Sequence, residues 1–298
     1  MNKNKVYRDL EKAIKGIDIK KDFDLFEFNT FKIHAIAPIF IRIKNLGEML
    51  KFIDYVNSSE LEWIILGNGS NVIINSVKNK IFVKFDKNYN KIVINDNVLR
   101  VTASCSLGEV IKNAVSKNLK GMEECIGIPG SIGGAVFMNA GCGNFEMSKV
   151  VEKVVAIENG KVKVFENKDC GFGYRESIFQ KNNAIILEVF IRLEKVENFD
   201  FKRVLNEAIL KRKNTQPISE NSAGSVFKNI GEIKVAKLID EAGLKGYQIG
   251  GAKVSEIHSN FIVTNNATAE DILSLISHIK NVIFEKHNLV LETEIKII

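Results

Sequence analysis

The feature that most constrains how this chain can fold is a dense run of glycines between residues 127 and 143. The segment GIPGSIGGAVFMNAGCG holds six glycines in seventeen residues. Glycine loses more conformational entropy on folding than any other residue, so this density indicates a backbone that passes very close to another group. That group is either a neighbouring chain segment, in a tight loop beneath a sheet, or a flat ligand such as a cofactor. Composition alone favours neither.

A second glycine motif, LGNGSN at residues 66–71, directly follows a predicted strand. Its successive peptide N–H groups, together with Ser70 and Asn71, form a pattern that can cradle a phosphate. The motif is neither the G-x-G-x-x-G of dinucleotide folds nor the G-K-S or G-K-T of nucleoside triphosphatase loops. Taken alone, it is more commonly an ordinary turn between two elements.

Hydrophobic periodicity predicts three consecutive regions of mixed helix and strand in these 298 residues. The first region is 1–86, with helices at 7–15 and 46–57 and strands at 62–66 and 81–85. The second region is 87–196. It is predicted to be a mostly antiparallel sheet with a tight hairpin at Asn159-Gly160, a helix at 107–117 and a last strand at 184–193.

The third predicted region is 197–298. Helical patterns cover 201–213, 234–242 and 269–287, and the segment 290–298 is predicted as a strand. Gly243 is a plausible C-terminal cap for the second helix, and Thr268 with Asp271 resembles a helix-starting cap for the third. The predicted fold class is therefore α+β.

Charge and cysteine content exclude several classes of protein. Lys plus Arg number 42 against 36 Asp plus Glu, a net charge of +6 that is scattered along the chain. This modest excess mostly aids solubility and does not favour nucleic-acid binding, and it would equally suit substrates that carry phosphates. The four cysteines form no C-x-x-C pair and the four histidines have no metal-ligand spacing, so no metal site is predicted.

Two further observations bear on location. No apolar stretch approaches the ~20 residues needed to cross a bilayer, and the charged residues 1–15 contain no apolar signal segment. We therefore expect a cytoplasmic protein that does not insert into the membrane.

Three isolated polar residues are candidates for chemistry: Arg175 in CGFGYRES, Ser225 in the polar loop ENSAGSVFKN and Glu294 in the last predicted strand. Each has an ordinary explanation as well. Arg175 is then a surface ion-pair partner, Ser225 a turn residue beside Gly224, and Glu294 part of a solvated strand face. Taken singly, these ordinary explanations are favoured.

Taken in order along the chain, several motifs resemble the UDP-N-acetylenolpyruvoylglucosamine reductase family. The resemblance covers residues 28–298, and the length suggests the shorter variety of the family, without an extra segment that closes over substrate. The motifs are GNGSN at 67–71, GIPGSIGGAVFMNAG at 127–141, GYRESIF at 173–179, AGSVFKN at 223–229, LIDEAGLKG at 238–246, SEIHSNFIV at 255–263 and LETEIKI at 291–297.

The resemblance implies a non-covalent FAD site. It implies an FAD-binding fold of the vanillyl-alcohol oxidase type in two subdomains, 1–86 and 87–196, followed by a smaller α+β substrate-binding domain, 197–298. The cofactor-binding residues that it implies are Gly67, Asn68, Gly69, Ser70, Asn71, Pro129, Gly130, Ser131, Ile132, Gly133, Gly134, Ala135, Asn139 and Gly141.

The resemblance also implies the reaction. NADPH reduces the FAD, which in turn reduces the enolpyruvyl ether of UDP-N-acetylglucosamine to UDP-N-acetylmuramate, a step of peptidoglycan synthesis that serves cell wall formation, cell shape and division. Arg175, Ser225 and Glu294 match the family's catalytic positions. The implied substrate contacts are Tyr174, Lys228 and Asn229.

Two positions depart from the family pattern. His34 and Ala35 stand where the family usually has a Gly-Gly pair, which affects backbone access to the cofactor there, and Ile230 replaces a common proline, which affects loop stiffness. Two rival functions stay open at this stage. One is a flavin oxidase on the same cofactor fold, which would not need the C-terminal polar residues. The other is a non-catalytic nucleotide-binding module.

Overall fold

The computed structural model describes residues 1–59 and 61–298, which form two compact units. The first unit comprises Met1–Asp22, Pro38–Asn68 and Asn79–Ile209, and the second comprises Phe23–Ala37, Gly69–Lys78 and Leu210–Ile298. Each unit is assembled from separate stretches of chain and is described below by itself. The three regions predicted from the sequence, 1–86, 87–196 and 197–298, follow chain order and remain a prediction.

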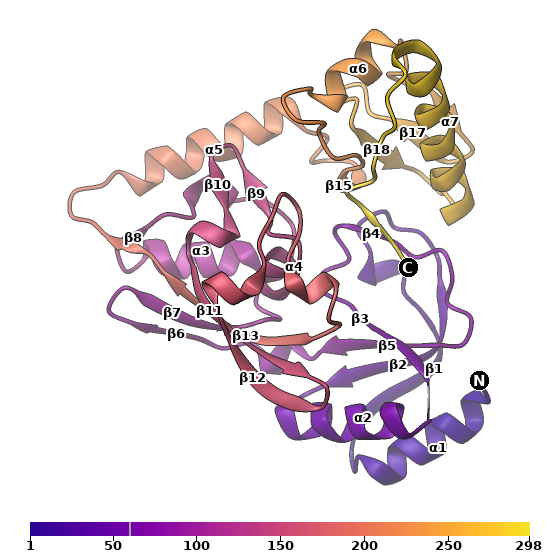
Figure 1. Ribbon diagram of the computed structural model, residues 1–298, viewed down its shortest axis with the longest axis vertical. Coiled ribbons are helices and arrows are strands. Elements are labelled where there is room, and N and C mark those ends of the chain that lie inside the picture. The colour runs from indigo at the N-terminus through magenta and orange to yellow at the C-terminus, as the bar shows by residue number, and fades with distance from the viewer. Residues whose placement is uncertain (60) are drawn as a thin grey trace. The chain divides into compact units, whose positions relative to one another are not determined.

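The first unit contains a mixed α/β layer at its N-terminal end. Its four-stranded sheet has the order β1-β2-β5-β3, in which β2, β5 and β3 are parallel. Figure 1 shows the two helices of this region running along one side of the sheet. They bury apolar side chains such as Leu10 and Phe52 against strand residues such as Ile41 and Val83. The elements are α1 Lys3–Ala13, β1 Asp18–Asp24, β2 Ile36–Ile43, α2 Leu46–Ser59, β3 Glu62–Ile65 and β5 Lys80–Phe85.

The first unit also contains a five-stranded antiparallel sheet in the order β12-β11-β13-β7-β6, which confirms the sheet predicted for this part of the chain. The predicted hairpin is confirmed too, since Asn159 and Gly160 both have positive φ, 51° and 73°, as a two-residue turn requires. The strands and helices are β6 Ile92–Asn95, β7 Val98–Thr102, α3 Leu107–Val115, α4 Ile132–Phe137, β11 Val151–Glu158, β12 Lys161–Glu166 and β13 Ile185–Arg192.

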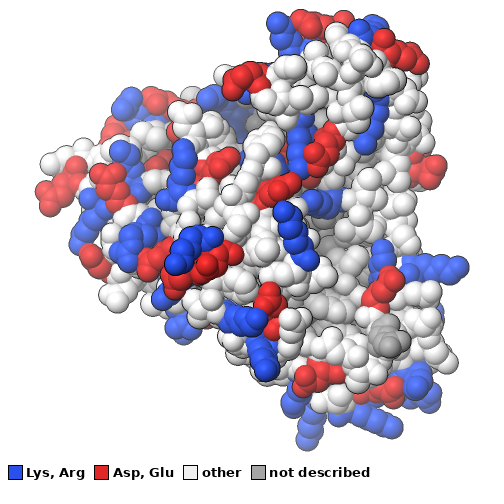
Figure 2. Space-filling model, viewed as in Figure 1, with Lys and Arg blue, Asp and Glu red and all other residues white. Residues whose placement is uncertain are grey.

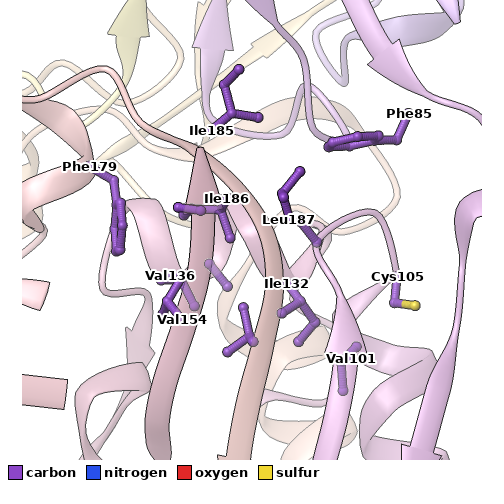
Figure 3. Close-up of a cluster of buried hydrophobic side chains, with 14 of the residues drawn as sticks. Phe85, Val101, Cys105, Ile132, Val136, Val154, Phe179, Ile185, Ile186 and Leu187 are labelled. Carbon is purple, nitrogen blue, oxygen red and sulfur yellow. The ribbon is translucent and has the colours of Figure 1, made fainter. Parts of the chain in front are cut away.

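The core of this sheet is formed by β13, β11 and α4. Figure 3 shows Ile186 and Val154 from the strands gathered with Ile132 and Val136 of α4 and with Phe179. The short helix α4 was not predicted, because three glycines in the segment 130–134 disfavour a helix on propensity alone. Burial of Ile132 and Val136 supplies the stability that propensity lacks.

The second unit is a four-stranded antiparallel sheet, β15-β18-β17-β16, with α6 and α7. Helix α7 begins with the predicted cap, in which Thr268 and Asp271 bond each other's backbone N–H groups, and Gly243 follows α6 with φ +76° as expected for a C-terminal glycine. The elements are β4 Val72–Ile73, β15 Asn221–Ser225, α6 Val235–Glu241, β16 Gln248–Ile249, β17 Ala252–Val254, β18 Phe261–Thr264, α7 Ala269–His287 and β19 Lys296–Ile297.

Shorter elements complete the chain. Helix α5 is divided between the two units, and two small antiparallel pairs, β8 with β14 and β9 with β10, lie in the first unit. Their bounds are α5 Phe201–Thr215, β8 Leu119–Lys120, β14 Glu194–Lys195, β9 Gly141–Cys142, β10 Phe145–Glu146, and the 3₁₀ turns Phe26–Phe28, Lys87–Tyr89, Glu123–Cys125, Met147–Lys149, Asn167–Cys170 and Ile178–Gln180.

The prediction of a strand over 290–298 is wrong in extent, since only Lys296–Ile297 forms one. Residues before it change partners along the way. The Lys228 N–H donates to Glu292 O and the Glu294 N–H to Val226 O, whereas the Lys296 N–H donates to Asn71 O. Because the segment passes from one neighbour to another, it builds no continuous ladder. Ser225, predicted in a loop, is the last residue of β15.

The distribution of surface charge and the polarity of the helices agree with what the sequence predicted. Figure 2 shows acidic and basic side chains intermixed on the face in view, with no large area of one sign, as the scattered lysines predicted. Within residues 1–59 and 61–298, no helix is both long and apolar enough to cross a membrane.

Candidate functional site

The start of the first glycine motif and the second glycine motif, both predicted to bind the cofactor, meet in the first unit. A Cβ atom added to Gly67 would lie 2.7 Å from Ser131 Oγ, which is closer than real side-chain contacts allow. Gly67 therefore lies directly against the start of α4, although the two residues are far apart in the sequence.

The first turn of α4 is fixed by short polar and apolar contacts. Ser131 Oγ accepts a hydrogen bond of 3.3 Å from the Gly134 N–H and so caps the helix. The Gly133 N–H donates to Ala103 O at 2.8 Å, and a Cβ on Gly133 would lie 2.8 Å from Ala103 Cβ. At this point the glycine is required by a neighbouring chain segment, the first of the two alternatives that composition left open.

A lysine missed by the sequence analysis lies beside the first glycine motif. Lys84, in β5, donates through Nζ to the carbonyl oxygen of Gly67. Removal of the ammonium from water, with a smaller effect from the charge of Arg42, lowers the pKa of Lys84 to about 8. Arg42 is itself paired with Asp18 at 3.0 Å.

Ser104 provides a test of whether this region fits a bound cofactor. Its neighbours Ala103 and Cys105 accept hydrogen bonds from the Gly133 and Ile132 N–H groups, so Ser104 lies at the first turn of α4. The hydroxyl of Ser104 is buried and has no hydrogen-bond partner within residues 1–59 and 61–298. A buried hydroxyl without a partner destabilises the fold, and a bound group with several acceptor oxygens would satisfy it. The residues present thus fit FAD, whose ribityl and phosphate groups carry such oxygens.

Arg175 is held in a strained conformation by its surroundings. Its backbone φ is +58°, which is unusual for a residue other than glycine or asparagine. The Gln180 side-chain amide donates to Arg175 O at 3.0 Å and to Phe137 O at 2.7 Å. The Arg175 guanidinium donates to Gly141 O at 3.2 Å and lies 5.1 Å from the ring centroid of Tyr174. The structure therefore brings Arg175, Gly141 and Tyr174 together, and their roles toward substrate and cofactor stay predictions.

Asn139 contacts the same loop through Gly173. It is almost fully buried, and its side-chain amide donates to Gly173 O at 2.9 Å and to Glu146 at 3.2 Å. Its side-chain oxygen accepts from the Ser148 N–H at 2.9 Å. The structure thus gives this predicted cofactor residue a clear structural task, in which it anchors the chain two residues before Arg175.

Ser225 and Glu294 lie on adjacent segments of the second unit. The Glu294 N–H donates to Val226 O at 2.8 Å, immediately after the serine, and Asn71 Nδ2 donates to Glu294 O at 3.4 Å. A Cβ atom on Gly224 would lie 4.0 Å from Ser70 O. Two candidate catalytic residues and the end of the first glycine motif are therefore neighbours.

Asn260 fixes the chain that follows Ser225. Its side chain accepts from the Phe227 N–H at 3.0 Å and donates to Phe227 O at 2.8 Å, and it is 5% exposed. Its backbone oxygen accepts from the Val226 N–H. Asn260 belongs to the motif 255–263, but nothing in its sequence neighbourhood signals this task, which depends on a strand far away in the chain.

The two predicted substrate contacts beyond the serine have partners within the protein. Lys228 Nζ lies 2.6 Å from Glu292 Oε1, and Lys228 is largely buried while Glu292 is exposed. Asn229 Oδ1 accepts from the Val235 N–H at 3.1 Å, at the start of α6. These contacts hold both side chains in defined positions.

Comparison with known proteins accounts for this arrangement. A family model described as FAD binding domain matches residues 37–165, and one described as UDP-N-acetylenolpyruvoylglucosamine reductase, C-terminal domain, matches residues 216–298. The reductase of that name from Prochlorococcus marinus is 35% identical over 285 residues, which cover 94% of this chain and 98% of the relative. The chain belongs to the UDP-N-acetylenolpyruvoylglucosamine reductase family.

Further members of the reductase family match over almost the whole chain. The reductase of Alkaliphilus oremlandii is 36% identical over 301 residues, which cover 100% of this chain and 99% of the relative. The crystal structure of the Thermus caldophilus reductase superimposes with a TM-score of 0.79 at 29% identity, covering 94% of this chain and 98% of that one. Three predictions are thus confirmed: membership of the family, the FAD-binding fold, and the class of the enzyme as an FAD-dependent oxidoreductase.

In this member of the reductase family, His34 stands at the first position of the expected Gly-Gly pair and is hydrogen-bonded to Asp24. His34 Nδ1 lies 2.6 Å from Asp24 Oδ2, and the His34 ring stacks on Phe26 with centroids 4.5 Å apart. Burial would raise the pKa of Asp24, but hydrogen bonds from His34 and from the Phe26 and Ala35 N–H groups outweigh it and lower that pKa. The backbone is therefore tied to Asp24 at this corner.

The three candidate catalytic residues of this reductase-family chain are divided between the units. Arg175 belongs to the first unit, and Ser225 and Glu294 belong to the second. Their convergence on one substrate remains a prediction.

Proposed function

We propose that this chain reduces the enolpyruvyl ether of UDP-N-acetylglucosamine to UDP-N-acetylmuramate, with NADPH as the source of electrons. Support comes from relatives that carry the name of this reductase and match over nearly their whole length. The proposal includes the implied place in peptidoglycan synthesis, with its consequences for cell wall formation, cell shape and division, and a cytoplasmic location.

The structural observation that carries the proposal is the adjacency of Ser225 and Glu294. The Glu294 N–H donates to Val226 O, while Asn260 fixes Phe227 on the other strand. A flavin oxidase acting on another alcohol has no need for a serine and a glutamate on adjacent backbone segments of the C-terminal domain. The adjacency therefore favours the reductase over its nearest rival.

Arg175 has the chemical properties to stabilise negative charge on the substrate. The substrate double bond is conjugated to a carboxylate, so charge grows on C2 and on that carboxylate when C3 accepts a hydride. A guanidinium keeps its charge at all working pH values and offers forked donors that match a carboxylate. Because Gln180 and Gly141 hold Arg175 in place, little reorganisation is needed when this charge develops.

Ser225 is proposed to deliver the proton to C2. FAD, when bound, supplies the hydride that adds to C3. A serine hydroxyl is a weak acid, but the dianionic enolate that forms from C2 and the substrate carboxylate is a base strong enough to accept its proton. Ser225 ends β15, paired with Phe261 of β18, so its short side chain is held on a rigid element.

Glu294 is proposed to act either in its neutral form or as the partner of a cation that orients other groups. An ionised, unpaired carboxylate beside an anionic intermediate would raise the barrier. The Glu294→Gln variant separates the two forms, because it keeps the shape and a neutral donor. Near-normal turnover supports the neutral form, and full loss of turnover supports the paired one.

The remaining site residues complete the proposal. Tyr174, Lys228 and Asn229 are proposed to contact the substrate. The residues of the two glycine motifs are proposed to bind FAD non-covalently, and they are Gly67, Asn68, Gly69, Ser70, Asn71, Pro129, Gly130, Ser131, Ile132, Gly133, Gly134, Ala135, Asn139 and Gly141.

The proposal is tested by following the flavin absorbance of the purified protein without oxygen. NADPH is expected to bleach the flavin, and the enolpyruvyl sugar nucleotide to restore it. In Ser225→Ala, bleaching should proceed at a nearly normal rate while recovery slows by about 10²- to 10⁴-fold, because only recovery needs the proton. Equal slowing of both steps contradicts the acid role, and a wild-type flavin that the sugar nucleotide cannot reoxidise contradicts the proposed function.

A further inference from the structure

Lys84 is a partly buried cation whose charge the described protein does not balance. It lies at the end of β5, where the Leu66 N–H donates to Val83 O at 2.7 Å and brings the first glycine motif alongside. Within residues 1–59 and 61–298, no carboxylate forms an ion pair with Lys84, and its hydrogen-bond acceptor is Gly67 O. The nearby Arg42 adds positive charge and gives its own bond to Asp18.

Such an arrangement is unfavourable in the absence of an anion. An ammonium taken out of water without a counter-charge destabilises a fold, and proteins normally pair or neutralise it. The lysine with its charge unbalanced is also the one bonded to the motif that belongs to an FAD-binding domain. The missing negative charge is therefore expected on the ligand of that domain.

The bond to Gly67 O also fixes the direction of the next amide group. In a planar trans peptide the C=O and the following N–H point in opposite directions. With the Gly67 carbonyl directed at Lys84, the Asn68 N–H is directed away from Lys84. A cation on the carbonyl polarises the whole peptide and makes that N–H a stronger donor.

We infer that Lys84 is a positioning residue for the diphosphate of the bound dinucleotide: through Gly67 O it orients and polarises the Gly67–Asn68 peptide, whose N–H faces the phosphate oxygens. The charge of Lys84 also attracts the diphosphate across one peptide group, and a partly buried site screens this attraction only weakly. The inference rests on the FAD binding that is part of the proposed function, but not on the identity of the substrate.

The test compares three substitutions of Lys84 with a control on the same strand. Lys84→Met removes charge and donor, Lys84→Gln keeps a neutral donor, and Lys84→Arg keeps both. Lys80→Met serves as the control, because Lys80 points to the same face of β5 four residues earlier. The measured quantities are the rate at which the holoenzyme releases FAD, its FAD dissociation constant, and the affinity of flavin-stripped protein for riboflavin, which has no phosphate.

We expect Lys84→Met to raise the FAD dissociation constant about 10- to 100-fold and to leave riboflavin affinity within about twofold of wild type. The FAD dissociation constant of Lys84→Gln should lie between those of wild type and Lys84→Met. That of Lys84→Arg should stay within about fivefold of wild type, and that of Lys80→Met should equal wild type. The melting temperature of flavin-stripped Lys84→Met should equal or exceed that of wild type, since an unbalanced charge has been removed.

Three results overturn the inference. One is Lys84→Met protein that keeps FAD as tightly as wild type, and another is a loss of riboflavin affinity as large as the loss of FAD affinity. The third is Lys84→Arg protein as weak as Lys84→Met. Wild-type protein that binds FAD but does not react with the enolpyruvyl sugar nucleotide counts against the proposed function alone, so the two failures are distinguishable.

Discussion

At the residue scale, the chemistry of this chain depends on side chains that hold others in place. Arg175 has a left-handed backbone, a conformation that costs on the order of 1 kcal/mol for a residue with a Cβ. The hydrogen bonds from Gln180 to Arg175 O and to Phe137 O offset that cost. Arg175 was proposed as a candidate from its motif, but Gln180 was not, because an amide five residues away has no local signature.

Replacing Gln180 tests this support. Gln180→Leu leaves two carbonyl oxygens without their donor, so Arg175 should lose its fixed position and turnover should fall about tenfold. Stopped-flow measurements should assign the loss to reoxidation of the flavin by the sugar nucleotide, with reduction by NADPH unchanged. Gln180→Lys keeps a donor and should recover part of the rate. A Gln180→Leu enzyme that slows in both steps alike would point to general damage.

Lys84 should make the stability of the flavin-free protein depend on pH. Its pKa is lowered to about 8 from 10.5, so the unfolded chain holds this proton more tightly than the native one. The native state is then penalised at pH values below 8, and the penalty falls as the pH rises from 8 to 10.5. Its size is about 3 kcal/mol.

The measurement compares melting temperatures of flavin-stripped wild type and Lys84→Met at pH 7.5 and pH 10. The melting temperature of wild type should rise relative to that of the variant as the pH rises, because the variant lacks the titrating ammonium. The comparison removes the effects of other titrating groups. A difference between the two proteins that stays constant over this range would show that Lys84 is well solvated.

At the element scale, helices and turns with local signatures were predicted well. Helix α7 has both its apolar stripe and its capping box in the sequence, and the hairpin at Asn159-Gly160 needs only two residues with positive φ. Helix α4 and the short β19 were not predicted correctly. Their form depends on contacts with Ala103, Asn71 and other distant residues, which override local preference.

A pair of glycine substitutions in helices tests the close approach of α4 to β7. In Gly133→Ala the new methyl would lie 2.8 Å from Ala103 Cβ, so the melting temperature should fall, by an amount that corresponds to about 1 to 3 kcal/mol, and FAD should be released faster. Gly108→Ala, in α3, meets no atom within 4 Å and should leave stability unchanged or raise it by up to about 1 kcal/mol. Differential scanning calorimetry of the flavin-stripped variants measures both. A melting temperature of Gly133→Ala that is unchanged or raised, as expected for Gly108→Ala, would show that α4 moves away from Ala103 easily.

At the scale of the whole molecule, chain order and spatial grouping differ. The second unit takes Phe23–Ala37 and Gly69–Lys78 from the N-terminal part of the chain, and Phe31, Ile33 and Ile73 are fully buried in its core. Thr264 Oγ1 donates to Phe31 O, and β19 pairs with β4. Residues 197–298, taken as a domain in the sequence analysis, therefore lack part of the core that they help to form.

A fragment test follows from this composition. Residues 197–298 produced alone should show helical circular dichroism but no cooperative thermal transition, because the apolar surface that Phe31, Ile33 and Ile73 cover is left exposed. The full chain is the control. A sharp transition in the fragment, with dispersed amide resonances, would show that the C-terminal region folds without its N-terminal segments.

The sequence by itself determined the family, the fold class, the flavin cofactor and most of the helices, because these depend on motifs and periodicities that lie within short stretches of chain. Only the tertiary structure decided that Gly67 rests on Ser131, that Asn260 secures the chain beyond Ser225 and that Lys84 holds the Gly67 carbonyl. Each of these contacts joins residues from different strands or helices. Their energy comes from burial and from hydrogen bonds that exist only after the elements have packed, so no local pattern of residues records them.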